Sequence, residues 1–516
     1  MQPNEKADDN KKVNKNIQNM IPDDESASVK GVQDLEGLFT LLDLKGGELL
    51  VKNADLPKFN LSDQISVFPL DSQHSMIRKQ PEKIIDVPEV RVAVIGNVDA
   101  GKSTMLGVLT KGMLDDGRGK ARANLFRHKH EFDSGRTSSI GQELIGFTVD
   151  GTVIRPPPPD DKHAAGKNHH LQVIPWSEVC ARAAKVVSFM DLAGHERYLK
   201  TTMFGLTGGA PDYAVLMVGA NAGMIGMARE HLTLAFGVGI PVLVIVTKVD
   251  MCPAEIRDDT IKQVTKLLKG HQRIPLLIKS DSDVVFCLQQ FRLNQRICPV
   301  FTVSNVTGAG VPLVELMLNG LPVPQERYSR DSKVGEFYIT DTYSVPGVGT
   351  VVAGTMIMGK MSLGQTVHLG PDTIGTFTPV VIKGVQRKRV NVQVAEAGQC
   401  ASFALKRIKR NSIRRGMVLV THPENAGRTV REFSAEIIVL FHSTTISPKY
   451  QAMLHCGVVR QSVSIVTLPQ AVLRTGDRAV VRFRFMRWPE YLRVGQRLLF
   501  REGRTKGVGR IVELHE

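Results

Sequence analysis

The chain has 516 residues, a length that predicts roughly three or four domains. Of these residues 42% are hydrophobic, and the formal net charge is +15. The most apolar stretches, 213–220 and 238–246, have the length of strands and fall far short of the ~20 residues that a membrane helix needs, and the polar start lacks the apolar core of a signal peptide. We therefore expect a cytoplasmic monomer that makes no membrane contact, with six widely spaced cysteines that remain reduced.

The N-terminal 88 residues are expected to lie outside the main domains. Residues 1–30 are polar, mixed in charge and poor in aromatic side chains, which predicts a disordered tail. In the extension 31–88, apolar residues at helical spacing between Leu35 and Leu42 predict a short helix.

Residues 89–327 alternate between strand-length apolar runs and segments long enough for helices. This alternation predicts an α/β domain whose parallel sheet is covered by helices on both faces. An insertion at about 151–183, which contains four consecutive prolines from Pro156 to Pro159, predicts a surface segment.

After residue 328 the pattern changes to short β runs punctuated by glycine and proline. Closely spaced strands of this kind predict a β-barrel or a sandwich. We divide this part into two β domains, 328–425 and 429–516, at a cluster of Pro, Asn and Gly residues.

A glycine-rich turn follows the first strand of the α/β domain and precedes a helix-capable segment. The turn fits the pattern GxxxxGKS, and its place between strand and helix makes the match specific. Backbone N–H groups can surround phosphate oxygens there, Lys102 can reach the β and γ phosphates, and the Ser103 hydroxyl can ligate Mg²⁺. The predicted phosphate-binding residues are Gly96, Asn97, Val98, Asp99, Ala100, Gly101, Lys102, Ser103 and Thr104.

The sequence DLAGH, residues 191–195, directly follows another predicted strand and fits the pattern DxxG. A carboxylate at this strand end, Asp191, can hold Mg²⁺, and the backbone N–H of Gly194 can contact the γ phosphate. His195 comes next and is placed to orient the water that attacks the γ phosphate. Without that neighbouring glycine, a lone histidine would carry no functional meaning.

Two short segments at strand ends are the candidates for base recognition. The sequence TKVD places Asp250 where its carboxylate can accept both N–H groups on the edge of guanine, while the stem of Lys248 covers the ring. Backbone N–H groups of a later segment can reach the guanine carbonyl. The predicted guanine-binding residues are Thr247, Lys248, Asp250, Ser304, Asn305 and Val306.

The strings GNVDAGKS and DLAGHE, in this order, resemble the translational GTPase superfamily. Longer strings, among them SGRTSSIG, VTKVDMCP and REGRTKGVGRI, resemble more closely the eukaryotic elongation-factor-like family named "GTP-binding protein", first and second types. The resemblance covers about 32–516. It implies a G domain followed by two β-barrels, GTP hydrolysis with Mg²⁺, and work on ribosomes, tRNA or RNA quality control.

The resemblance also assigns single positions. Thr137 falls where the superfamily has the switch threonine that ligates Mg²⁺ beside Ser103 and Asp191, and Asp99 falls where a P-loop carboxylate can bind a monovalent cation. Thr247 replaces an asparagine that braces the P-loop, which predicts weaker nucleotide binding. Arg136 replaces an isoleucine of an apolar gate around the catalytic histidine, which predicts different control of hydrolysis.

The excess of positive over negative charge is confined to the β domains. Residues 1–329 hold 38 Lys and Arg against 38 Asp and Glu, whereas residues 330–516 hold 28 against 13. Such a basic region favours a phosphate-rich partner, above all nucleic acid, although solvated cationic faces also produce it. The candidate RNA contacts are Arg387, Lys388, Arg389, Lys406, Arg407, Lys409, Arg410, Arg482, Arg484 and Arg487.

These features predict a ribosome-associated GTPase that binds tRNA or a related RNA through its barrels and hydrolyses GTP when a partner positions His195. The alternative is a regulatory switch that uses GTP to recruit protein partners, such as RNA-decay factors, and carries no tRNA.

Overall fold

The computed structural model describes residues 59–62, 65–70, 73–78 and 87–515, with gaps at 124, 127–128, 130, 132–136, 157–173, 295, 324–331, 426 and 504. The predicted tail, the predicted helix near Leu35, most of the proline-rich insertion and Arg136 lie outside these residues. Among the helices of the described ranges, none is long and apolar enough to span a membrane.

A small antiparallel sheet precedes the main domains. It consists of β1 (Phe59–Ser62), β2 (Ile65–Leu70) and β3 (Gln73–Arg78), in that order. The sequence does not predict these strands, because their pairing with one another, rather than a strong local pattern, defines them.

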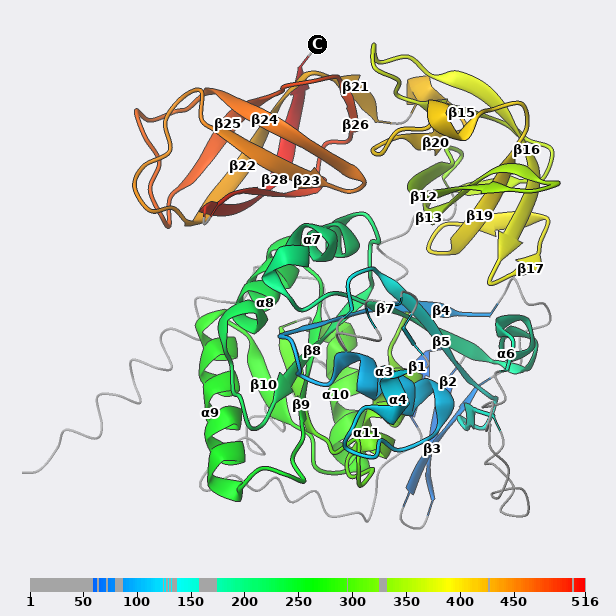
Figure 1. Ribbon diagram of the computed structural model, residues 1–516, viewed down its shortest axis with the longest axis vertical. Coiled ribbons are helices and arrows are strands. Elements are labelled where there is room, and N and C mark those ends of the chain that lie inside the picture. The colour runs from blue at the N-terminus through cyan, green and yellow to red at the C-terminus, as the bar shows by residue number, and fades with distance from the viewer. Residues whose placement is uncertain are drawn as a thin grey trace, which may run out of the picture. The chain divides into compact units, whose positions relative to one another are not determined.

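The α/β domain is built on an eight-stranded sheet with the order β10-β11-β9-β8-β4-β7-β5-β6 (Figure 1). The core pairings are parallel, and β5 runs antiparallel to β7. The strands are β4 (Glu89–Gly96), β5 (Gly141–Phe147), β6 (Val153–Ile154), β7 (Lys185–Asp191), β8 (Tyr213–Gly219), β9 (Val242–Thr247), β10 (Ile274–Leu277) and β11 (Ile297–Thr302). Strand-length apolar runs of the sequence, among them 213–220 and 238–246, form β4, β7, β8, β9 and β11, each buried on both faces as a parallel sheet requires.

Helices cover both faces of this sheet. One hydrophobic core joins a face to α3 (Lys102–Lys111), α10 (Asp281–Leu293) and α11 (Val311–Gly320). A second core joins the other face to α7 (Leu199–Thr207), α8 (Gly226–Val238) and α9 (Ala254–Gly270). Three short elements belong to the same domain: α4 (Lys120–Ala123), α6 (Trp176–Arg182) and the 3-10 turn η3 (Glu196–Tyr198). The predicted α/β class is thus confirmed.

Two β-barrels follow, as the sequence predicts. In the first, pairing of β15 with β16 closes the order β15-β20-β12-β13-β19-β16-β17. The second is a closed barrel with the order β22-β25-β24-β23-β27-β28. Each has its own hydrophobic core.

The first barrel region contains β12 (Glu336–Val345), β13 (Gly349–Met358), β14 (Lys360–Ser362), β15 (Thr366–Gly370), β16 (Thr378–Arg387), β17 (Val390–Asn391), β18 (Val394–Glu396), β19 (Cys400–Leu405), η5 (Arg410–Ser412) and β20 (Val418–Val420). The turn η6 (Pro423–Asn425) follows β20 at the end of the first domain. The second barrel region contains β21 (Arg428–Val430), β22 (Glu432–Phe441), β23 (Gln451–Cys456), β24 (Val459–Thr467), β25 (Arg478–Phe485), β26 (Glu490–Leu492), β27 (Arg497–Glu502) and β28 (Thr505–His515).

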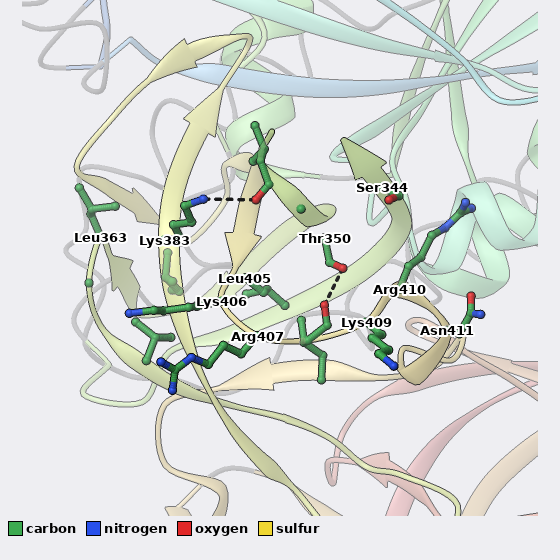
Figure 2. A pocket seen from close by; sticks show the side chains of 16 residues that line it. Ser344, Thr350, Leu363, Lys383, Leu405, Lys406, Arg407, Lys409, Arg410 and Asn411 are labelled. Atoms are coloured by element: carbon green, nitrogen blue, oxygen red, sulfur yellow. Dashed lines mark hydrogen bonds between the residues drawn. The ribbon is translucent and has the colours of Figure 1, made fainter. Parts of the chain in front are cut away.

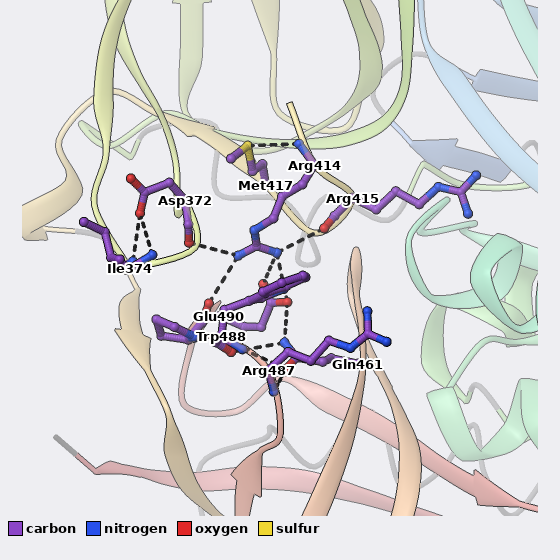
Figure 3. Close-up of polar contacts among 11 residues, drawn as sticks. Asp372, Ile374, Arg414, Arg415, Met417, Gln461, Arg487, Trp488 and Glu490 are labelled. Atoms are coloured by element: carbon purple, nitrogen blue, oxygen red, sulfur yellow. Dashed lines mark hydrogen bonds and ion pairs between the residues drawn. The ribbon is translucent and has the colours of Figure 1, made fainter. Parts of the chain in front are cut away.

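A buried ion pair joins the two barrels. The Arg414 guanidinium, which precedes β20, binds both carboxylate oxygens of Glu490 on β26 at 3.0 and 2.9 Å (Figure 3). Gln461 donates to the same carboxylate at 2.8 Å, and the Trp488 ring lies 5.6 Å from the Arg414 guanidinium carbon. Because breaking such a pair would leave a buried charge uncompensated, it fixes one barrel against the other.

A second buried carboxylate joins the α/β domain to the first barrel. Glu89, at the start of β4, contacts Arg387 at 3.4 Å and Lys388 at 2.7 Å. Burial alone would raise the pKa of Glu89, but the charges of Lys388 and Arg387 outweigh it and hold the pKa at about 2. Glu230 of α8 makes the corresponding link to the second barrel through Arg501 and Lys506.

Candidate nucleotide-binding site

The sheet brings the two phosphate motifs together. Strands β4 and β7 are parallel neighbours, with Val94 opposite Asp191, so the loop after β4 and the DxxG segment after β7 emerge at the same sheet edge. Helix α3 begins at Lys102 directly after this loop. A small pocket is lined by Val98, Asp99, Gly101, Lys102, Ser103, Thr104, Arg122, Thr137, Gly194 and His195.

The three predicted Mg²⁺ ligands converge. The Ser103 hydroxyl lies 2.6 Å from Asp191 Oδ2 and 2.9 Å from Thr137 Oγ1, and Thr137 Oγ1 lies 3.3 Å from the same carboxylate oxygen. Asp191 Oδ1 is buried and has no hydrogen-bond partner. Burial raises the pKa of Asp191, and Lys102, Ser103 and Thr137 only partly offset it. Hydroxyl and carboxylate oxygens with one orphaned acceptor are a donor set that fits Mg²⁺.

Lys102 is buried at the floor of the pocket, where its ammonium donates to the carbonyl oxygen of Asn97 at 2.7 Å. Burial lowers the pKa of Lys102, and the charges of Asp191 and Asp99 oppose that shift. Gly194 lies directly against this group, because a Cβ there would collide with Lys102 Nζ and with the backbone of Asn97. The DxxG glycine is therefore required by close packing on the P-loop.

His195 is half-buried and caps the turn η3. Its Nδ1 accepts a hydrogen bond from the Arg197 backbone N–H at 3.1 Å. When Nδ1 accepts, a neutral imidazole carries its proton on Nε2. The free nitrogen of His195 is then a donor, which suits the orientation of a water or a phosphate oxygen better than proton abstraction.

The base-recognition segments lie at the ends of β9 and β11. Thr247 is fully buried, and its hydroxyl donates to the P-loop carbonyl of Ala100 at 3.0 Å, so the threonine retains a brace to the P-loop. Asp250 is exposed at the loop after β9. In the segment 304–306, the Ser304 N–H donates to the carbonyl oxygen of Ala309 at 3.0 Å.

The Val306 N–H donates to the Ser304 hydroxyl at 3.2 Å. Within the described residues, this leaves the Asn305 N–H as the donor of segment 304–306 that has no acceptor, and it is the one we expect at the guanine carbonyl.

Two further polar residues support the site and carry no sequence motif. His231 of α8 is fully buried, and its Nδ1 accepts from the Gly96 N–H at 3.3 Å. Burial lowers the pKa of His231 to about 3, so this histidine is a neutral acceptor at the end of β4. Glu131 is buried beyond α4 and accepts from the N–H and hydroxyl of Ser138, both at 2.8 Å, which anchors the chain beside Thr137.

The predicted RNA contacts fall into three groups. In the first, Arg387 and Lys388 are occupied by Glu89, with side-chain exposures of 3% and 9%. In this conformation neither cation is accessible to an RNA backbone, so we withdraw that expectation for both. The sequence shows the basic cluster but not its carboxylate partner, which lies about 300 residues away. Arg389 is exposed, with its guanidinium carbon 5.1 Å from the Trp176 ring centroid.

The second group lies on the second barrel. Arg482 and Arg484 share one face of β25, and both pair with Glu432 of β22, so the cluster keeps one uncompensated positive charge. Arg487 lies past the end of β25, where its guanidinium carbon is 5.8 Å from the Trp488 ring.

The third group surrounds a pocket of about 850 Å³ on the first barrel (Figure 2). Its lining contains five cationic side chains and no carboxylate: Lys383, Lys406, Arg407, Lys409 and Arg410. The half-exposed side chains of Val348 and Leu363 add apolar surface. A pocket of this composition can receive phosphates together with a base.

Removing the Thr247 hydroxyl tests its bracing role. In Thr247→Val, the buried carbonyl of Ala100 loses its donor, so we expect the Kd values for GTP and GDP to rise about tenfold, or about 1.4 kcal/mol. Titration with a fluorescent nucleotide measures this. The matched control is Thr260→Val, which removes another buried hydroxyl, bonded to Ala220 at 2.9 Å and outside the pocket, and should leave both Kd values unchanged. Unchanged affinity in Thr247→Val would contradict the bracing role.

Comparison with known proteins places this site in a family. Residues 88–323 match the family model "Elongation factor Tu GTP binding domain", and residues 349–420 match "Elongation factor Tu domain 2". GTP-binding protein 1 of Xenopus laevis is 52% identical over 431 residues, which cover 83% of this chain and 64% of that protein. The chain thus spans less than two thirds of that relative's length. Elongation factor 1-alpha of Pyrococcus furiosus is 26% identical over 428 residues, 78% of this chain and 91% of that protein.

The bacterial selenocysteine-specific elongation factor EF-Sec shares the fold, with a TM-score of 0.57 and 19% identity over 82% of this chain and 58% of that one. GTP-binding protein 2 of Homo sapiens is 42% identical over 458 residues, which cover 88% of this chain and 73% of that protein. The chain therefore belongs to the elongation-factor-like family of GTP-binding proteins 1 and 2, within the translational GTPases.

Proposed function

We propose that this chain hydrolyses GTP to GDP and phosphate and, in its GTP form, binds tRNA or a related RNA through its barrels while it works on ribosomes in the cytoplasm. The observation that carries the hydrolytic part is the convergence of Ser103, Thr137 and Asp191 beside Lys102 and His195 in one pocket. Such an arrangement supports a switch in which Thr137 is held only when the γ phosphate is present.

Ser103, Thr137 and Asp191 would hold Mg²⁺, which would neutralise phosphate charge. Asp99, exposed on the P-loop with a positive φ of 59°, is the candidate to hold a monovalent cation. Lys102 binds the β and γ phosphates, and the Gly194 N–H contacts the γ phosphate. His195 orients the attacking water through Nε2, and a ribosome or another partner that shifts η3 would place it.

The basic pocket of the first barrel supports RNA as the partner. Five cations together with the exposed apolar side chains of Val348 and Leu363 suit the end of an RNA strand, where phosphates and an unstacked base are both available. The junction between the barrels adds to this. Arg415 is exposed there, and the pKa of Arg460 is lowered by burial and, less, by the charge of Arg415.

The second candidate function is a GTP-regulated switch that recruits RNA-decay factors or other proteins without a tRNA cargo. It is favoured by the occupation of Arg387, Lys388, Arg482 and Arg484 by carboxylates, which reduces the cationic surface open to RNA.

Hydrolysis by the purified chain, with and without ribosomes, tests the first part. We expect slow turnover that ribosomes stimulate, and we expect His195→Ala to lose that stimulation because the water is no longer oriented, a loss of at least about a hundredfold in the stimulated rate. Equal, unstimulated rates in both proteins would reject the ribosome-triggered mechanism.

Filter binding of tRNA tests the second part. We expect tighter binding with a non-hydrolysable GTP analogue than with GDP, and affinity that falls steeply as salt rises. Lys406→Ala combined with Lys409→Ala should weaken binding about tenfold or more, whereas Lys262→Ala on the exposed face of α9 should not. RNA affinity that ignores the nucleotide and the pocket substitutions would favour the recruiting switch.

A further inference from the structure

One arginine of the nucleotide pocket belongs to none of the motifs. Arg122 lies on the short helix α4 and lines the pocket together with Lys102, Thr137, Gly194 and His195. None of the residues predicted to bind guanine lines this pocket, so the pocket belongs to the phosphate part of the predicted nucleotide site, and Arg122 lies there. Within the described ranges, no ion pair or side-chain hydrogen bond occupies its guanidinium.

The backbone that carries Arg122 is fixed to the P-loop. Helix α4 packs directly on α3, the helix that starts at Lys102, because Gly107 allows contact so close that a Cβ there would collide with the carbonyl oxygen of Ala121. Ala121 is buried, with 3% exposure. Arg122 therefore lines the pocket from a rigid support, which reduces the reorganisation needed during the reaction.

A buried carboxylate holds the turn before α4. Asp115 accepts N–H groups from Gly117 at 3.1 Å, Gly119 at 3.2 Å and Ala121 at 2.9 Å. Its own N–H donates to the Asn305 carbonyl oxygen at 2.9 Å. The segment that presents Arg122 is thus tied to the loop expected to recognise guanine, so a bound base and the position of Arg122 are linked through one hydrogen bond.

We propose that Arg122 supplies, from within the chain, the positive charge that stabilises the transition state of GTP hydrolysis. This inference rests on the proposed GTPase function. In the reaction, the water oxygen forms a bond to the γ phosphorus, and the bond from that phosphorus to the β–γ bridging oxygen breaks. The electron pair stays on the oxygen of GDP, and the water proton passes to the released phosphate. The guanidinium of Arg122 neutralises the charge that grows on the bridging and γ oxygens.

An arginine with this role raises the rate more than it raises ground-state affinity, because its contact is strongest in the transition state. A cation on the α phosphate would instead contribute equally to GTP and GDP affinity. The two roles are therefore separated by measuring hydrolysis and binding in the same variants.

The test is single-turnover GTP hydrolysis by the full chain with Mg²⁺, together with GTP and GDP Kd values and trapping of GDP with aluminium fluoride. For Arg122→Ala we expect the rate constant of hydrolysis to fall on the order of 1,000-fold and aluminium fluoride to trap GDP no longer. The Kd values for GTP and GDP should stay within about threefold of those of the original protein. Arg122→Lys should recover less than a tenth of the rate, because an ammonium lacks the planar fork. The control Arg118→Ala, four residues earlier and exposed, should hydrolyse GTP normally.

An unchanged rate in Arg122→Ala would overturn the inference. Equal losses of GTP and GDP affinity with an unchanged rate would also overturn it and would assign Arg122 to ground-state phosphate binding. Absence of hydrolysis by the unsubstituted chain, with and without ribosomes, would defeat the proposed function and this inference together, whereas an active chain with an indifferent Arg122 would defeat the inference alone.

Discussion

The contact among Ser103, Thr137 and Asp191 is the one on which the function of the α/β domain depends. Each side chain comes from a different segment: the start of α3, the chain between α4 and β5, and the end of β7. They meet because β4 and β7 are parallel neighbours and because Glu131 anchors the residues after Thr137. A change in the phosphates bound at this point would therefore alter the contacts of three segments of the domain at once.

The links between domains rest on the same physical principle. Glu89, Glu230 and Glu490 are carboxylates that are buried or nearly so, and each is matched by cations from another domain. A buried ion pair contributes little net stability compared with apolar packing, but separation of its partners is costly. Such contacts define discrete arrangements of the domains, which a nucleotide switch requires.

Much of the site could be predicted from sequence because its motifs are local. The P-loop, DxxG and TKVD segments each follow an apolar strand, and strand ends of a parallel sheet share one edge, so these segments could be expected to lie at the same edge of the sheet. Thr137 required the family resemblance, since a lone threonine in a loop carries no pattern. The sheet β1–β3 was missed because strand pairing decides it.

Arg122, His231 and Glu131 could not be found in this way. Arg122 gains its position from packing of α4 on Gly107, and His231 and Glu131 gain theirs from hydrogen bonds to distant backbone. For the basic cluster at Arg387 and Lys388, the sequence suggests a contact with RNA that the structure does not favour. The sequence shows the positive charges of the cluster but not the buried carboxylate of Glu89 that neutralises them.

Equilibrium titration with GTP and ATP, in Mg²⁺ and after its removal by a chelator, tests the central claim most directly. We expect GTP to bind at least about a hundredfold more tightly than ATP, because two hydrogen bonds to the Asp250 carboxylate are made with guanine alone, and we expect removal of Mg²⁺ to weaken GTP binding markedly. ATP binding as tight as GTP binding, or GTP affinity that is indifferent to Mg²⁺, would contradict the assignment of this pocket as a Mg²⁺-dependent GTP site.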